Sequence, residues 1–109
     1  SDYNEPEPGF VLADLTKFDG KRHPRPAEII LIVEVSDSTL KYDRETKLSL
    51  YAEAGITEVW IVNLPNNIVE AHQKPSNGIY QLTKIFNRGE TIQSDALPNT
   101  SLEVDKILG

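Results

Sequence analysis

The sequence has 109 residues, of which 39% are hydrophobic and 26% charged, as expected for one small globular domain. It contains no cysteine, which excludes disulfides and thiolate metal sites and is typical of the reducing cytoplasm. No apolar run approaches the roughly 18 residues of a membrane-spanning helix. We therefore predict a cytoplasmic domain over residues 1–109 with no membrane partner. The net charge of −6 argues against a broadly basic nucleic-acid-binding surface, but it leaves room for a locally basic or metal-bridged nuclease cleft.

The first third of the chain predicts two strands separated by a loop. Residues 9–15, GFVLADL, are a short apolar strand candidate. The loop that follows contains the turn dipeptide Asp19-Gly20 and two prolines that are incompatible with a regular helix. Residues 29–36, IILIVEVS, are the strongest strand signal in the chain. Their nearly continuous apolar run is typical of a central strand that is covered on both faces.

One helix and three further strands are predicted next. The helix runs from about Thr39 or Lys41 to Ala54, and Gly55 stands where a left-handed helix stop is expected. Strands are predicted over residues 57–64, 68–74 and 79–86, followed by a short extended piece and a helical turn at residues 102–108. This order predicts an α+β fold in which one mixed sheet has a helix packed on it.

A single helix can cover only one face of this sheet. The other face has to be covered by the C-terminal tail, by a partner subunit, or by an N-terminal segment that precedes this chain. The sequence alone leaves these three alternatives open.

Glu34 is the first candidate for a functional residue. It stands within an otherwise apolar strand, where burying a carboxylate is costly unless the group is paired, protonated or bound to a cation. Two interpretations stay open. Glu34 is either a functional acid, or a residue near the end of its strand that water reaches.

Asp43, Lys47 and Tyr51 form a polar stripe along the predicted helix, because they are spaced four residues apart. In the simplest interpretation the stripe is a solvent-exposed Asp–Lys pair, which contributes only a few tenths of a kcal/mol. The alternative is that the helix, which follows its strand directly, places its first turns over the strand end that carries Glu34. Crevices at such strand ends are where open α/β sheets bind ligands.

The histidines and the basic loop give weaker signals. His23 and His72 have no metal-ligand spacing, so each is interpreted as a surface or hydrogen-bonded residue. The basic cluster Lys21, Arg22, His23 and Arg25 could contact phosphate, but a solvated loop is the simpler interpretation. The absence of a Gly-rich phosphate loop, a GxSxG elbow and an HExxH helix excludes NTPases, α/β-hydrolases and zincins.

The run RHPRPAEIILIVEVSDSTLKYDRETKLSLYAEAGITEVWIVNL closely resembles the Uma-two-like restriction endonuclease family, a bacterial family of the PD-(D/E)XK nuclease superfamily. The matching signature is Glu-Val-x-x-Ser-Thr at a strand end, then Tyr-Asp-x-x-x-Lys, Tyr-Ala, Gly-Ile and a strand with Trp-Ile-Val. The likeness continues into GETIQSDALPNTSLEVDKIL and covers nearly the whole chain. It implies a restriction-endonuclease-like mixed β-sheet.

The resemblance also implies an activity and a set of site residues. It implies a DNA endonuclease that hydrolyses phosphodiester bonds with Mg²⁺ or Mn²⁺. Glu34 corresponds to the second strand acid of the family, so it would be both a catalytic residue and the metal ligand. Ser36 stands where the superfamily has its lysine, and Lys47 on the helix is the natural equivalent, with Asp43 beside it as a third catalytic residue.

The sequence departs from the family pattern in two ways. The family has Pro-Asp just before its first apolar strand, whereas this chain has Pro8-Gly9, so Gly9 stands where the first metal-binding carboxylate is expected. Family members also carry a further N-terminal portion, so we expect a truncated domain whose uncovered sheet face is buried in a homodimer. The alternative to an active nuclease is a degenerate, non-catalytic member that acts as a binding or oligomerisation module.

Overall fold

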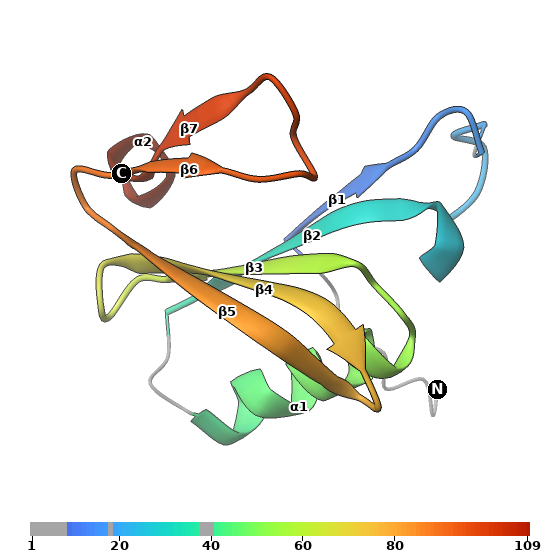
Figure 1. Ribbon diagram of the computed structural model, residues 1–109, viewed down its shortest axis with the longest axis horizontal. Helices are drawn as coiled ribbons and strands as arrows, with labels where there is room; N and C mark the ends of the chain where they lie inside the picture. Colours follow the sequence, from blue (N-terminus) through green and yellow to red (C-terminus); the bar gives the residue numbers. More distant parts are fainter. Residues whose placement is uncertain (1–8, 18, 38–40) are drawn as a thin grey trace.

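Five strands form one mixed sheet in the order β1-β2-β3-β4-β5 (Figure 1). The structure is a computed structural model that describes residues 9–17, 19–37 and 41–109, without the side chains of residues 41–43. The strands are β1 (Phe10–Ala13), β2 (Ile29–Ser36), β3 (Glu58–Asn63), β4 (Ile68–Ser76) and β5 (Ile79–Asn87). Strands β2 and β3 are parallel and are joined through a helix, while the other neighbouring pairs are antiparallel.

The remaining elements lie on the two faces of this sheet. Helix α1 (Lys41–Glu53) connects β2 to β3, and a 3₁₀ turn, η1 (Pro26–Glu28), leads into β2. The C-terminal segment contains a two-stranded sheet and a short helix, made of β6 (Thr91–Gln93), β7 (Ser101–Glu103) and α2 (Val104–Leu108). Figure 1 shows α1 on one side of the large sheet and the C-terminal segment on the other.

The predicted α+β fold class is confirmed, and each main strand begins and ends within two residues of its prediction. The end of α1 is also as predicted. Gly55 adopts φ +79°, the Gly55 amide donates to the Ala52 carbonyl, and the Ile56 amide donates to the Tyr51 carbonyl. These two bonds satisfy carbonyls that the helix itself leaves unpaired, which is the Schellman arrangement. The possible helix start at Thr39 lies outside the described residues.

The C-terminal segment covers the sheet face opposite α1, so the first of the three alternatives for that face is correct, and the prediction that a homodimer buries this face is wrong. Ile92 and Val104 pack against side chains of β2, β3 and β4 in one buried cluster: Leu31, Trp60, Val62, Val69 and Ala71. On the other face a second buried cluster joins the sheet to the helix: Ile32, Val59 and Ile61 of the sheet, Tyr51 of α1, and Ile56, which follows the helix. Alternate residues of β2 and β3 therefore enter different clusters, which explains why both strands read as continuous apolar runs.

The β1 end of the sheet is less well covered than its centre. Phe10 and Leu15 are 68% and 76% exposed, and in the described part of the chain β1 pairs with β2 alone. Across the same described residues, no helix is long and apolar enough to cross a membrane.

Candidate functional site

Two acids lie in one row across the sheet, on the face covered by α1. Glu34 of β2 is paired in register with Ile61 of β3, and Ile61 is paired with Glu70 of β4. Directly opposite residues of neighbouring strands point to the same face, so Glu34 and Glu70 flank Ile61 on the helix side. Both acids are buried, with exposed fractions of 4% and 7%.

Helix α1 brings a lysine and a tyrosine to Glu34. The Tyr51 hydroxyl donates a hydrogen bond to Glu34 Oε2, and Lys47 Nζ lies 3.8 Å from Glu34 Oε1. Lys47 and Tyr51 reach the same carboxylate because they are one helical turn apart on the inward face. The interpretation of Glu34 as a water-exposed strand end is therefore wrong, as is that of Tyr51 as part of a solvent-facing stripe. The catalytic roles of Glu34 and Lys47 stay predictions.

Asp43, the third predicted catalytic residue, lies in the first turn of α1. Its side chain falls outside the described part of the structure. Its place in the site therefore stays a prediction.

Glu70 is a second buried acid in the same face, and it was not among the residues predicted from the sequence. Its Oε2 accepts hydrogen bonds from Asn63 Nδ2 at 3.1 Å and from Arg44 Nη1 of α1 at 3.3 Å. Its Oε1 lies 3.0 Å from His72 Nε2, and the other ring nitrogen of His72 lies 3.0 Å from the Thr83 hydroxyl. His72 is thus a hydrogen-bonded residue, as predicted, with both ring nitrogens bonded to neighbouring side chains.

Glu70 is held in its charged form. Burial raises the pKa of its carboxyl, but the hydrogen bonds from His72 and Asn63 and the charge of Arg44 outweigh burial, so the pKa lies below its usual value. A sequence signal for this acid exists. Ile68-Val69-Glu70 repeats the pattern of Ile32-Val33-Glu34, an acid directly after two β-branched strand residues.

Gly9, the residue directly before β1, lies beside Glu34. A Cβ added to Gly9 would be 2.8 Å from the Val33 carbonyl oxygen and 3.7 Å from the Val35 amide nitrogen, the two backbone groups that flank Glu34. Gly9, where the family resemblance predicts the first carboxylate, thus lies next to Glu34; the roles of both positions stay predictions. However, any side chain at this position requires a shift of the β1 or β2 backbone, because real Cβ atoms do not approach an oxygen so closely.

Of the two buried acids in this row, Glu70 is already bonded to Arg44, Asn63 and His72, so Glu34 is the candidate carboxylate for a divalent metal ion. Among the described residues, no group of three His, Asp or Glu side chains is arranged to hold a metal. Mg²⁺ commonly keeps several waters and binds through one or two carboxylates together with substrate phosphates. Glu34 thus fits Mg²⁺ as a single protein ligand, with water and phosphate oxygens completing the coordination.

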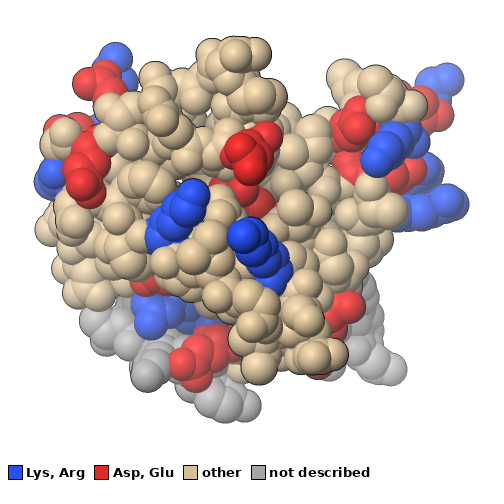
Figure 2. Space-filling model, in the orientation of Figure 1, with Lys and Arg blue, Asp and Glu red and all other residues tan. Residues whose placement is uncertain are grey.

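The basic loop between β1 and β2 is charge-balanced. Arg22 forms a two-bond ion pair with Glu28, at 2.8 and 2.7 Å, and the Arg25 amide donates to the same carboxylate at 2.7 Å. The Arg22 and Arg25 bonds lower the pKa of Glu28 to about 2. Figure 2 shows Lys and Arg side chains interspersed with Asp and Glu at this end of the molecule. This arrangement supports the interpretation of a solvated loop rather than a phosphate site.

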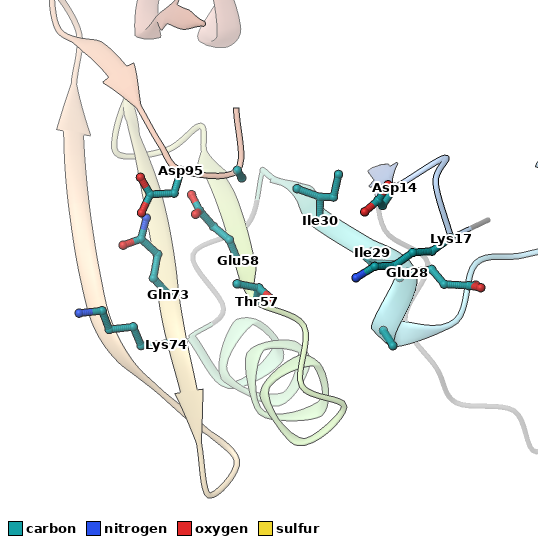
Figure 3. A pocket seen from close by; sticks show the side chains of 12 residues that line it. Asp14, Lys17, Glu28, Ile29, Ile30, Thr57, Glu58, Gln73, Lys74 and Asp95 are labelled. Carbon is teal, nitrogen blue, oxygen red and sulfur yellow. The ribbon is translucent and has the colours of Figure 1, made fainter. Parts of the chain in front are cut away.

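A pocket of about 370 Å³ lies away from Glu34, at the start of β2 (Figure 3). Glu58, Gln73 and Asp95 line one side, and Asp14, Lys17 and Glu28 line the other. Glu58, which is more deeply buried than Glu28, accepts hydrogen bonds from Trp60 Nε1 and the Ser94 hydroxyl, both at 2.6 Å. Glu58 therefore ties the C-terminal segment to β3, which is a structural role.

The mixed sheet, with a helix placed over an acid near the end of a central strand, is compatible with the restriction-endonuclease-like class of α+β proteins. The chain belongs to the Uma2 family: the family model, described as "Putative restriction endonuclease", matches residues 1–105. No curated protein matches the chain.

Proposed function

We propose that this chain is a DNA endonuclease that hydrolyses phosphodiester bonds with Mg²⁺ or Mn²⁺ in the cytoplasm. The observation that carries the proposal is the buried Glu34 carboxylate, which Lys47 and Tyr51 hold at a strand end. The family supports the nuclease class, and the absence of cysteine agrees with the compartment.

Each residue of this cluster has a distinct part in the proposed reaction. A bound Mg²⁺ would polarise the phosphodiester and lower the pKa of its water, and Glu34 would hold it. The Lys47 ammonium, whose side chain is 31% exposed, can contact a phosphate oxygen or the attacking water from the helix side. The Tyr51 hydroxyl donates to Glu34 Oε2 and fixes the orientation of the carboxylate, while Oε1 faces Lys47. Asp43 is retained as the proposed third catalytic residue.

A specific observation favours a second candidate function, a non-catalytic binding or oligomerisation module. Gly9 supplies no carboxylate, and the backbone around it has no space for a Cβ. A site that has lost its first acid binds metal more weakly, because fewer charged oxygens remain.

A paired substitution at Gly9 separates the two candidates. Gly9→Asp restores the carboxylate, and Gly9→Ala introduces the same close contact with the Val33 carbonyl without a charge. We expect both variants to lose about 1–3 kcal/mol of stability in EDTA, since overpacking costs that much. Mn²⁺ should then raise the melting temperature of Gly9→Asp more than that of Gly9→Ala, and nicking of supercoiled plasmid should increase only in Gly9→Asp.

The outcomes of this comparison are distinct. Metal-dependent nicking by the unsubstituted chain supports the active nuclease. Nicking only after Gly9→Asp identifies a degenerate site that is otherwise assembled. If neither the unsubstituted chain nor Gly9→Asp nicks DNA, and Mn²⁺ stabilises neither of them, the endonuclease proposal is wrong and the non-catalytic module is the remaining candidate.

We also propose that two copies of the chain associate through β1. The strand is an exposed sheet edge that carries the apolar Phe10 and is followed by Leu15, and such edges pair readily with a second copy around a two-fold axis. Sedimentation at micromolar concentration should give a dimer for the unsubstituted chain and a monomer for Phe10→Ser. Ile79→Ser, which alters a similarly exposed residue on the opposite edge strand, is the control and should remain dimeric. A monomeric unsubstituted chain would contradict the dimer.

A further inference from the structure

The site contains the same acid–cation unit twice. Lys47 of α1 pairs with the buried Glu34 of β2, and Arg44 of α1 pairs with the buried Glu70 of β4. The two acids lie in one row on either side of Ile61. The two cations are three residues apart on α1, so they are neighbours on one face of the helix, with Cβ atoms about 5–6 Å apart.

The two cations are also alike in their access to solvent. The Arg44 side chain is 26% exposed and the Lys47 side chain is 31% exposed, whereas each of their acids is almost fully buried. Among the described residues, Arg44 makes its side-chain contact to Glu70 through Nη1. A guanidinium has five N–H donors, so one bond to Glu70 leaves donors that can bind a ligand from the exposed side of Arg44.

Glu70 is itself anchored, and it therefore limits the positions that Arg44 can take. Asn63 and His72 bond to its two oxygens from β3 and β4. The carboxylate is ionised, since its pKa lies below the usual value. A fixed anion beside a partly exposed guanidinium preorganises the guanidinium for a second anion from solvent, because less side-chain freedom is lost on binding.

We propose that Arg44 binds a DNA phosphate next to the phosphate that Lys47 faces. This inference rests on the proposed nuclease function, for which it adds a substrate-contacting residue. The planar guanidinium can hold two phosphate oxygens at once, whereas the lysine acts as a point charge. Arg44 would therefore set the register of the DNA strand on α1, and Lys47 would act at the neighbouring phosphate.

The alternative is that Arg44 only neutralises Glu70. Under that alternative, removing the guanidinium leaves a buried carboxylate without its cation and lowers stability, but the number of phosphates bound stays the same. The salt dependence of DNA binding separates the two cases, because each phosphate contact that is lost changes the slope of log K against log[salt] by about 0.9 for duplex DNA.

The experiment uses a labelled duplex in EDTA, so that binding is measured without cleavage. Affinities are determined over a range of NaCl concentrations for the unsubstituted chain, Arg44→Gln and the control Arg88→Gln. Arg88 is an exposed arginine that bonds to Asn67 and pairs with Asp105, so it belongs to neither of the two acid–cation pairs of the site. We expect the slope to fall by about 0.9 in Arg44→Gln and to remain unchanged in Arg88→Gln.

A second variant keeps the test decisive if Arg44→Gln does not fold. Arg44→Lys retains the ion pair with Glu70 but loses the two-bond fork, so it should keep the slope and bind DNA several-fold more weakly at every salt concentration. The matched Arg88→Lys should bind as the unsubstituted chain does.

Three results would overturn the inference: an unchanged slope and affinity in the Arg44 variants, an equal loss in the Arg88 controls, or no measurable DNA binding by the unsubstituted chain. These results are independent of the nicking assay. A chain that loses one phosphate contact on Arg44→Gln but never cleaves DNA supports the role of Arg44 and contradicts the endonuclease. A chain that cleaves DNA with an unchanged slope contradicts only the role of Arg44.

Discussion

Replacing Glu34 with Gln is expected to lower the rate of Mg²⁺- or Mn²⁺-dependent plasmid nicking by at least about 100-fold, the usual effect of removing one essential catalytic group. Gln keeps the shape of the side chain and can still accept the Tyr51 hydrogen bond. It has no charge with which to bind a metal ion or to pair with Lys47. The measurement is the initial rate of conversion of supercoiled to open-circular plasmid, together with a melting curve that shows the variant is folded.

Two further variants make this experiment specific. Lys47→Ala should be impaired to a similar degree, and because it also leaves the buried Glu34 without its cation, a melting curve has to show that this variant is folded. Glu103→Gln removes the charge of an exposed acid on β7 and should nick DNA at the unsubstituted rate. Equal nicking by Glu34→Gln and the unsubstituted chain would mean that the activity comes from other residues or from a contaminating nuclease.

Replacing Ile92 with Ala is expected to lower the free energy of unfolding by about 2–5 kcal/mol, as is typical when a fully buried isoleucine is truncated. Ile92 is 2% exposed and packs, from β6, against side chains of the large sheet. Its loss leaves a cavity between the C-terminal segment and the sheet face opposite α1. Urea unfolding followed by Trp60 fluorescence measures the change, since Trp60 belongs to the same buried cluster.

Ile79→Ala is the matched control for this change. Ile79 is 64% exposed on β5, so the same truncation there should alter stability by no more than about 0.5 kcal/mol. A small effect at Ile92 would show that the C-terminal segment is not a necessary cover of the sheet. In that case a partner subunit would again be needed to shield the Leu31 face.

The site and the packing of α1 depend on each other. Glu34 and Glu70 are costly to bury alone, and each receives its cation from the same helix. Undocking α1 would leave both carboxylates without Lys47 and Arg44, so the helix that carries the proposed catalytic residues is also held in place by them. These ion pairs explain why the inward face of α1 can be polar in its N-terminal half, where Arg44 and Lys47 lie. Further along the chain, Tyr51 and Ile56 supply the apolar contacts with the sheet.

The sequence by itself determined the local elements and the first half of the site. Three features could be predicted directly because each depends on residues that are close together in the sequence. The β-branched run at residues 29–36 predicts β2, the glycine at position 55 predicts the end of α1, and the family motif identifies the candidate Glu34. The pairing of Glu34 with Lys47 could be expected because the helix follows its strand with only a short connection.

Only the tertiary structure decided which acids and cations meet across the sheet and what covers its second face. Arg44 and Glu70 are 26 residues apart, and they meet because β3 and β4 place Glu70 in the row of Glu34. The three-residue strands β6 and β7 are too short to show a periodic pattern. They lie over Trp60 because Ile92 and Leu102 pack against the cluster that contains it, and these contacts join residues far apart in the sequence. Contacts of this kind depend on the order and register of the strands, which local sequence patterns do not encode. The Arg44–Glu70 pair could therefore be identified only from the tertiary structure.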